Sequence, residues 1–210
     1  MGLQSLKMKS LSEIETTSKR ASKAAGYSWG ISEEVGKGIR LMELFGLAGI
    51  KNLSEYFKSK SNNKFESLNL INCDNQSEKY PYCPINFGIS FLDQVKTLEK
   101  FDKIRLSNIA YPLLVLPFLS RSSEIIGKKI HYKFDNHEFL LNFNVKVFSK
   151  IFNDKCPIIA KNVEIIFLEN KDNFSEEDWK SLYKLSEETF VEESDSLKKS
   201  AAGAGLTDND

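Results

Sequence analysis

The sequence predicts an α+β fold, in which an N-terminal helical subdomain precedes a mixed strand and helix core that contains an antiparallel hairpin. Three observations lead to this prediction. Two helical patterns come first, apolar and polar side chains then alternate around a two-residue turn near residue 135, and a helix-starting pattern begins at Ser175. We expect a single domain over 1–210, with a helical part at 10–58, a polar excursion at 59–82, an α+β core at 83–191 and a polar, Gly-rich, acidic tail at 192–210.

Charge, apolar runs and cysteine content narrow the function classes. Lys plus Arg and Asp plus Glu both number 29, so the chain lacks the basic character that is typical of nucleic-acid binders. The longest apolar run, residues 110–119, is too short to span a bilayer and contains two prolines. The N-terminus carries no signal-peptide pattern, and three cysteines suit a reducing compartment. We therefore expect a cytoplasmic protein that binds neither nucleic acid nor membrane.

The first helix is expected to begin at a capping box formed by Ser12 and Glu15. Its inner face carries mostly small side chains, which favours a close crossing against Gly38 of the second helix. The alternative is a weakly apolar helix on the surface.

The stretch AAGYSWGISEE at 24–34 joins the first two helices. Gly26 is typical of a helix end, and Ser32 can cap the helix that follows. Tyr27 and Trp29 then lie on a five-residue connection. Two large rings at that place either cover the core or form one wall of a pocket.

Glu34 lies within the apolar stripe of the second helix, which ends at Gly46. A carboxylate at the head of a buried face needs a partner or a raised pKa. Either free backbone N–H groups of the first turn satisfy Glu34, or it is a functional carboxylate.

The string Gly26-Tyr27-Ser28-Trp29-Gly30, followed by Glu33-Glu34 and Gly36, resembles the opening of the bacterial domain-of-unknown-function family 3726. The Cys83-Pro84 step and the ending from Gly203 to Asp210 fit the same family. The resemblance supports the domain boundaries and implies no established activity.

Cys83 and Arg121 are two further candidate site residues. Cys83 precedes a helical pattern, where a thiol can be activated, but no His neighbours it in the sequence. A buried structural thiol is therefore the alternative to a nucleophile. Arg121 lies among serines on a helix expected from Pro117 to Ile126, after a buried strand at 113–116. It can hold a carboxylate or phosphate, or it can face solvent.

The clearest pattern is a hairpin, with a strand at 130–134, a turn at Asp135-Asn136 and a strand from His137 to Phe148. This register pairs Lys133 with Glu138 and Phe134 with His137. It places His131 and His137, the only histidines, on opposite faces of the sheet, so we expect no metal site. The sequence also lacks nucleotide and dinucleotide fingerprints, so we expect no cofactor.

The C-terminal part starts with a further strand at 163–168 and a helix capped by Ser175 and Asp178, with Phe174 packed on Trp179. The expected buried stripe of this helix comprises Trp179, Leu182, Tyr183 and Phe190. The tail that follows is either disordered or forms an acidic cluster through Asp208 and Asp210.

Two function classes are compatible with these patterns. The first is a cytosolic enzyme that performs acid–base chemistry on a small polar metabolite without a nucleotide or redox cofactor. Its expected catalytic residues are Glu34, Cys83, Asp208 and Asp210, and its expected substrate-binding residues are Tyr27, Trp29 and Arg121. The second is a non-catalytic binding or assembly protein that docks through the Tyr27/Trp29 loop or the tail. A homo-oligomer is compatible with either class.

A pocket that joins Trp29, Glu34 and Cys83 favours the enzyme, whereas an exposed flat apolar patch at Tyr27 and Trp29 favours docking.

Overall fold

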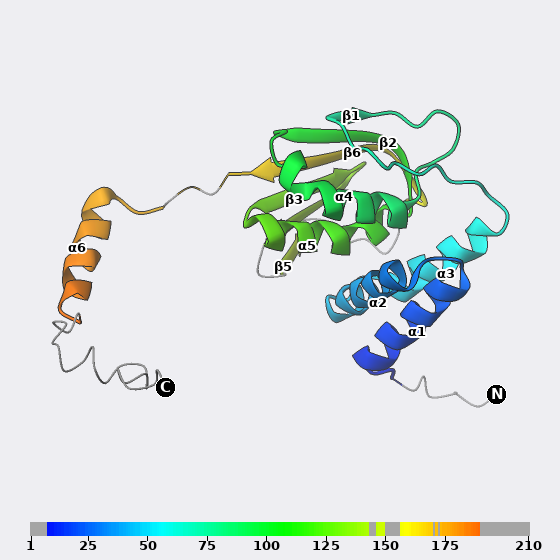
Figure 1. The fold of residues 1–210 in the computed structure, drawn as a ribbon, viewed down its shortest axis with the longest axis horizontal. Helices are drawn as coiled ribbons and strands as arrows, with labels where there is room; N and C mark the ends of the chain where they lie inside the picture. Colours follow the sequence, from blue (N-terminus) through cyan, green and yellow to red (C-terminus); the bar gives the residue numbers. More distant parts are fainter. Residues whose placement is uncertain (1–7, 143–145, 150–155, 170, 172, 190–210) are drawn as a thin grey trace, which may run out of the picture. The chain divides into compact units, whose positions relative to one another are not determined.

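The computed structural model describes residues 8–142, 146–149, 156–169, 171 and 173–189. The chain divides into two compact units, Met1–Asn170 and Lys171–Asp210. The α+β prediction is confirmed, because three helices come first and a six-stranded mixed sheet with further helices follows (Figure 1). In the described part of the chain, no helix is long and apolar enough to cross a membrane.

Three helices open the first unit: α1 (Leu11–Ala24), α2 (Trp29–Leu44) and α3 (Gly49–Lys60). The capping box of α1 is formed by Ser10 and Glu13, two residues before the predicted one. The Glu13 amide donates to the Ser10 hydroxyl at 3.2 Å, and the Ser10 amide donates to the Glu13 carboxylate at 2.8 Å. The same Ser-x-x-Glu spacing occurs at both places, so the sequence pattern alone does not choose between them.

Helix α2 begins at Trp29, earlier than predicted, because Ser28 rather than Ser32 is its N-cap. The Ile31 amide donates to the Ser28 hydroxyl at 3.3 Å. Ser32 is fully buried inside the helix, and its hydroxyl donates to the Ser28 carbonyl at 2.8 Å. Trp29 therefore lies in the first helical turn rather than on a loop.

Two glycines of α2 allow neighbouring segments to approach the helix closely, on opposite sides of it. A Cβ on Gly36 would lie 2.8 Å from the Glu15 carbonyl oxygen, so Gly36 allows α1 to cross closely. A Cβ on Gly38 would lie 3.0 Å from Pro117, so Gly38 faces the core helix instead. The predicted contact of Gly38 with the first helix is wrong, because residues two apart point about 200° apart around a helix.

The sheet has strand order β1-β2-β6-β3-β4-β5, in which β1 is parallel to β2 and all other pairs are antiparallel. Helices α4 and α5 lie together over one face of the sheet (Figure 1). The bounds of these elements are β1 (Asp74–Asn75), α4 (Pro84–Leu98), β2 (Lys103–Ala110), α5 (Leu116–Ile126), β3 (Lys129–Phe134), β4 (His137–Asn142), β5 (Lys146–Ser149) and β6 (Ile159–Leu168). The main core fills the space between this helix layer and the sheet, with Phe87, Phe91, Phe134 and Phe139 almost fully buried.

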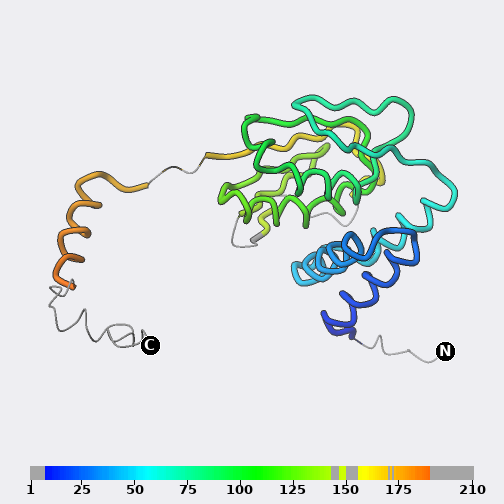
Figure 2. The backbone as a smooth tube through the Cα atoms, in the orientation of Figure 1, coloured from blue at the N-terminus to red at the C-terminus, as the bar shows by residue number. Residues whose placement is uncertain are grey.

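The polar excursion after α3 follows the edge of the sheet at β1, as the trace in Figure 2 shows. The Glu66 carboxylate organises part of this segment by accepting the backbone N–H groups of Glu78, Lys79 and Tyr80 at 2.6–3.1 Å. These backbone donors, of which Tyr80 is the strongest, lower the pKa of Glu66.

The predicted hairpin register is confirmed, with Lys133 opposite Glu138 and Phe134 opposite His137. The predicted second strand is too long, because it divides into β4 and β5, and β5 pairs back on β4. The two histidines lie on opposite faces of the hairpin, His137 on the buried one and His131 on the half-buried one.

The buried strand predicted at 113–116 is wrong. Residues Pro112–Val115 form a 3₁₀ helix, η1, that runs directly into α5. Tyr111 has a positive φ of 44°, which turns the chain out of β2, and the Leu114 amide then donates to the Tyr111 carbonyl at 2.9 Å. A short apolar run is compatible with a strand or a helix, and the turn at Tyr111 decides this one.

In the second unit, α6 (Glu176–Glu187) has the predicted capping box of Ser175 and Asp178. Phe174 stacks on Trp179 with ring centroids 5.7 Å apart, as predicted. The predicted burial of its apolar stripe is wrong, because Trp179, Leu182 and Tyr183 are more than half exposed. Phe190 and the tail, with Asp208 and Asp210, lie outside the described residues.

Candidate functional site

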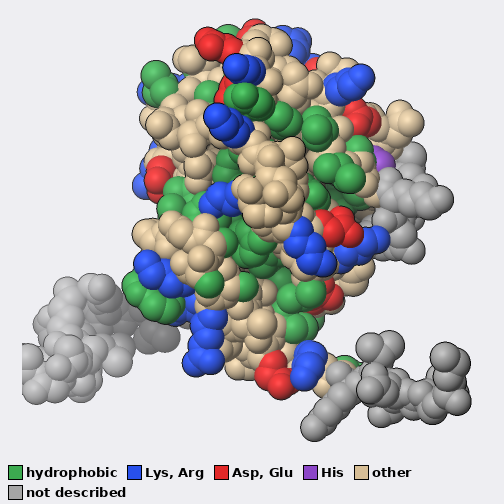
Figure 3. Space-filling model, turned by 90° about the vertical axis from the view of Figure 1, so that its right-hand side faces the viewer, with side chains coloured by type: hydrophobic (Ala, Val, Ile, Leu, Met, Phe, Trp, Pro, Cys, Tyr) green, Lys and Arg blue, Asp and Glu red, His purple; other side chains and the backbone are tan. Residues whose placement is uncertain are grey.

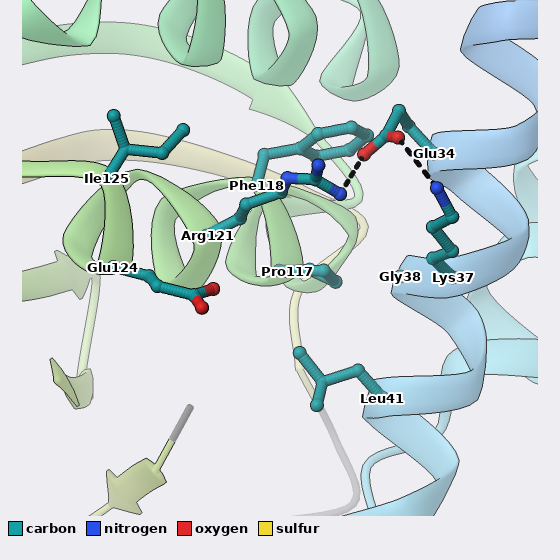
Figure 4. Close-up of a pocket in the computed structure, with 9 residues that line it drawn as sticks. All are labelled: Glu34, Lys37, Gly38, Leu41, Pro117, Phe118, Arg121, Glu124 and Ile125. Carbon is teal, nitrogen blue, oxygen red and sulfur yellow. Dashed lines mark hydrogen bonds and ion pairs between the residues drawn. The ribbon is translucent and has the colours of Figure 1, made fainter. Parts of the chain in front are cut away.

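A cleft of about 440 Å³ lies between α2 and α5. One wall comes from α2 and the other from α5, which belongs to the helix layer over the sheet (Figure 4). The residues that line it are Glu34, Lys37, Gly38, Leu41, Pro117, Phe118, Arg121, Glu124 and Ile125.

An ion pair between two predicted site residues bridges the cleft. Arg121 of α5 donates from Nη1 to the Glu34 carboxylate at 2.7 Å, although the two residues are 87 positions apart. Lys37 donates to the other Glu34 oxygen at 3.3 Å (Figure 4). Glu34 therefore has the charged partners that its place on the apolar face of α2 requires.

These charges are partly exposed, which limits what they contribute to stability. The Glu34 side chain is 23% exposed and that of Arg121 48% exposed. Pairs with this much solvent contact contribute up to about 1 kcal/mol. Glu34 raises the pKa of Lys37 through its hydrogen bond and its charge, so Lys37 stays protonated at neutral pH.

Apart from Glu124, the rest of the lining is apolar. Gly38 allows the backbone of α2 to approach Pro117, and Phe118 lies next to them with only 5% exposure. Leu41 extends the apolar wall from α2 along the same gap (Figure 4). The cleft therefore combines an apolar wall with a few charged groups, which is the usual composition of a ligand site.

A second cluster joins Tyr27, Tyr56 and Cys83 in the interior. The Tyr56 hydroxyl lies 2.9 Å from the Tyr27 hydroxyl and 2.9 Å from the Cys83 thiol, and the Asn86 amide donates to that thiol at 3.3 Å. Burial raises the pKa values of Tyr27 and Tyr56 far above the ordinary value of a phenol, and the nearby Cys83 adds to this. Both hydroxyls therefore stay protonated.

The structure brings the predicted site residues together only in part. Glu34 and Arg121 meet in the cleft, and Tyr27 and Cys83 meet in the buried cluster. Trp29 lines neither: its side chain is 57% exposed, and Lys23 lies 5.5 Å from the centre of its ring. The predicted joint pocket of Trp29, Glu34 and Cys83 is thus not formed.

Sequence reasoning missed three residues that complete these two places: Lys37 and Glu124 in the cleft, and Tyr56 in the buried cluster. A local pattern indicates Lys37, because it follows Glu34 by one helical turn and can therefore pair with it. Glu124 likewise follows Arg121 by one turn. Tyr56 had no such signal, because its partners come from distant parts of the chain.

The face of the molecule drawn in Figure 3 shows Lys and Arg side chains dispersed among Asp and Glu side chains, without one large basic patch. Within the described ranges, no three His, Cys, Asp or Glu side chains come together as ligands for a metal ion.

Comparison with known proteins supports the predicted family resemblance. Residues 9–82 match the family described as "Protein of unknown function (DUF3726)". This stretch includes α1, α2 and α3, and therefore the α2 wall of the cleft with Glu34 and Lys37. The Cys83-Pro84 step, Arg121 and the C-terminal ending lie beyond the matched stretch. No curated protein and no solved structure matches the chain.

Proposed function

We propose that this protein binds a small polar metabolite in the α2–α5 cleft, with Arg121 holding an acidic group of the ligand. The observation that carries the proposal is the Arg121–Glu34 ion pair across a cleft that also has apolar lining residues. Among the described residues, Arg121 donates a side-chain hydrogen bond to Glu34 alone, so most of its five N–H donors are left for a ligand.

Size and composition support a small ligand. The volume of about 440 Å³ falls within the range of roughly 300–1,000 Å³ that is typical of small-molecule sites. The apolar side chains of Leu41 and Ile125, which line the cleft and are not buried, offer area to bury, and the charged groups give orientation. A guanidinium binds carboxylate or phosphate through two parallel hydrogen bonds, which gives both strength and geometry.

Acid–base catalysis at the same place is a second candidate function, and Glu34 is the observation that favours it. Among the expected catalytic residues, Glu34 lines the cleft, whereas Cys83 lies in the buried cluster. A ligand that takes over Arg121 releases one Glu34 oxygen, which then can accept a proton from the ligand. The position of Cys83 between two tyrosine hydroxyls favours a structural thiol.

Docking of another protein through Tyr27 has less support, because Tyr27 is only 7% exposed and Trp29 alone remains on the surface. A cytoplasmic location remains our proposal, since Cys73 and Cys83 are free thiols. The assembly of several copies stays a prediction.

The test is a thermal-shift screen of the full chain against small carboxylates, phosphates, amines and zwitterions. We expect at least one compound to raise Tm and the Arg121→Gln variant to lose that rise. The matched control is Arg40→Gln, because Arg40 also forms an exposed ion pair between two helices, with Glu15 at 3.0 Å, but does not line the cleft. A compound that stabilises both variants as well as the parent protein contradicts the proposal. Turnover of the compound, lost in Glu34→Gln, would distinguish an enzyme from a binding protein.

A further inference from the structure

We infer that the ligand of the cleft is a zwitterion, an amino acid whose carboxylate binds Arg121 and whose ammonium group binds Glu124. Its apolar part packs against Leu41 and Ile125, the apolar lining residues that are not buried. This inference rests on the proposed function and adds the chemical class of the ligand.

Arg121 ends a series of ion pairs whose total charge is positive. A chain of alternating charges runs along α1 and α2 to the cleft, with links of 2.7–3.5 Å. Its members in order are Lys19, Glu33, Lys37, Glu34 and Arg121. Three cations alternate with two anions, so these five residues together carry one excess positive charge. Since Glu34 is already shared with Lys37, Arg121 at the end of the chain can accept a further carboxylate.

Glu124 is a second charged group of the cleft that is available to a ligand. Among the described residues, Glu124 forms no ion pair, although it lies one helical turn from Arg121 on α5. Opposite charges at this spacing commonly pair. Here Arg121 points toward Glu34 and Glu124 points toward the gap beside Leu41 (Figure 4). The cleft therefore presents a cation and an anion that do not neutralise each other.

The positive and negative charges of the whole lining are equal in number. Lys37 and Arg121 carry two positive charges, and Glu34 and Glu124 carry two negative ones. A simple anion can pair with Arg121 alone and a simple cation with Glu124 alone. A zwitterion matches both. The apolar wall then selects a compound with a hydrocarbon part over a small hydrophilic one.

The experiment compares four ligands of similar apolar size by calorimetry on the full chain: leucine, 6-aminohexanoate, hexanoate and hexylamine. We expect at least one of the two amino acids to bind about tenfold or more tightly than both single-charge compounds, since a charge-assisted hydrogen bond of about 1.4 kcal/mol corresponds to a factor of ten. Leucine and 6-aminohexanoate differ in the separation of their charges. Whichever of them binds more tightly reports the span between the two binding groups.

Two variants test whether Glu124 binds the ammonium group of the ligand. Glu124→Gln should weaken the preferred amino acid about tenfold and leave hexanoate unchanged. The control is Glu55→Gln on α3, because Glu55 has no ion pair among the described residues and does not line the cleft. It should leave both affinities unchanged.

The outcomes separate the two proposals. If hexanoate or hexylamine binds as tightly as the more tightly bound of the two amino acids, the zwitterion inference fails, whereas the proposed ligand-binding cleft is not affected. An amino-acid affinity that Glu124→Gln does not change also overturns the zwitterion inference. If none of the four compounds binds but another compound stabilises the protein through Arg121, the zwitterion inference fails and the proposed ligand-binding cleft is supported. If no compound of any class acts through Arg121, the proposed function fails as well.

Discussion

Tyr56 joins three separate parts of the first unit through a single hydroxyl group. It lies on α3, and its hydroxyl contacts Tyr27 from the α1–α2 connection and Cys83 at the start of α4. All three side chains are buried. The thiol that the sequence marks as a candidate nucleophile therefore lies in a packing contact between the N-terminal helices and the core.

The Tyr56 hydroxyl should matter for stability because its removal leaves two buried polar partners with fewer hydrogen bonds. We expect Tyr56→Phe to lower the free energy of unfolding by about 1–3 kcal/mol. Urea denaturation followed by circular dichroism measures this change. Tyr183→Phe is the control, because Tyr183 is 52% exposed on α6, and it should change stability by less than about 0.5 kcal/mol. Equal small effects of both substitutions would show that the cluster contributes little.

The charged residues of the cleft show how far single residues can be interpreted from sequence. Glu34 on an apolar stripe indicates a need for a partner, and Arg121 among serines indicates an anion site. Both indications are local. Glu34 and Arg121 can pair with each other only because α2 approaches α5 closely at Gly38 and Pro117, and no local pattern in the sequence encodes this approach.

The crossing of α1 and α2 depends on the absence of a side chain at Gly36. A Cβ there would meet a backbone oxygen of α1 at 2.8 Å, which a rotamer change cannot relieve. A Cβ on Gly30, near the start of the same helix, would point into open space, with no neighbouring group within 4 Å.

Alanine at these two glycines should therefore act in opposite directions. We expect Gly36→Ala to destabilise the protein by about 1–3 kcal/mol through overpacking. Gly30→Ala should be neutral or stabilise by up to about 1 kcal/mol, because alanine favours helix more than glycine does. Thermal and urea unfolding of both variants measure the difference. A stable Gly36→Ala protein would mean that the two helices move apart easily.

A row of alternating charges crosses five strands on the open face of the sheet. Its members are paired in register, and they are Glu138, Lys133, Glu164, Arg105 and Asp74. Glu164 also accepts a hydrogen bond from Lys103 at 3.0 Å. This hydrogen bond, with the charges of Lys103 and Arg105, lowers the pKa of Glu164.

The lowered pKa of Glu164 predicts how the stability of the protein depends on pH. A carboxylate whose pKa is lower in the folded state stabilises the fold above its unfolded pKa, about 4.3, and loses this effect as pH falls through the folded value. Glu164→Gln should therefore cost up to about 1 kcal/mol at pH 7, and the cost should shrink below about pH 4. Urea unfolding of both proteins across this range measures it. A cost that is constant with pH contradicts an ionic role.

The elements that the sequence predicts well are those with local determinants. The hairpin register follows from Asp135-Asn136 and the alternation around it, and α6 follows from Ser175 and Asp178. The errors occur where two local solutions compete. Residues 113–116 are apolar enough for a strand or a helix, and the helix wins because Tyr111 takes a positive φ. In the same way, Ser28 and Ser32 are both acceptable caps.

At the scale of the whole chain, the main hydrophobic core lies within the first unit and extends from Tyr27 to Phe167 in sequence. Strand β6 supplies its centre, because β6 pairs with β2 on one side and β3 on the other. The stability of the first unit should therefore depend on β6. Helix α6 belongs to the second unit.

Two truncated chains test the contributions of β6 and of the second unit to this stability. A chain that ends at Asn170 keeps the core and should unfold cooperatively, with a Tm within about 4 °C of the full chain, the shift expected for about 1 kcal/mol in a protein of this size. A chain that ends at Ile158 lacks β6 and leaves β2 and β3 without their shared neighbour. It should show no cooperative transition, because the buried residues of β6, among them Val163 and Ile165, are lost from the core. Calorimetry of the full chain and of both truncated chains measures these stabilities. A large loss of stability in the chain that ends at Asn170 would mean that the second unit contributes to the folding of the first.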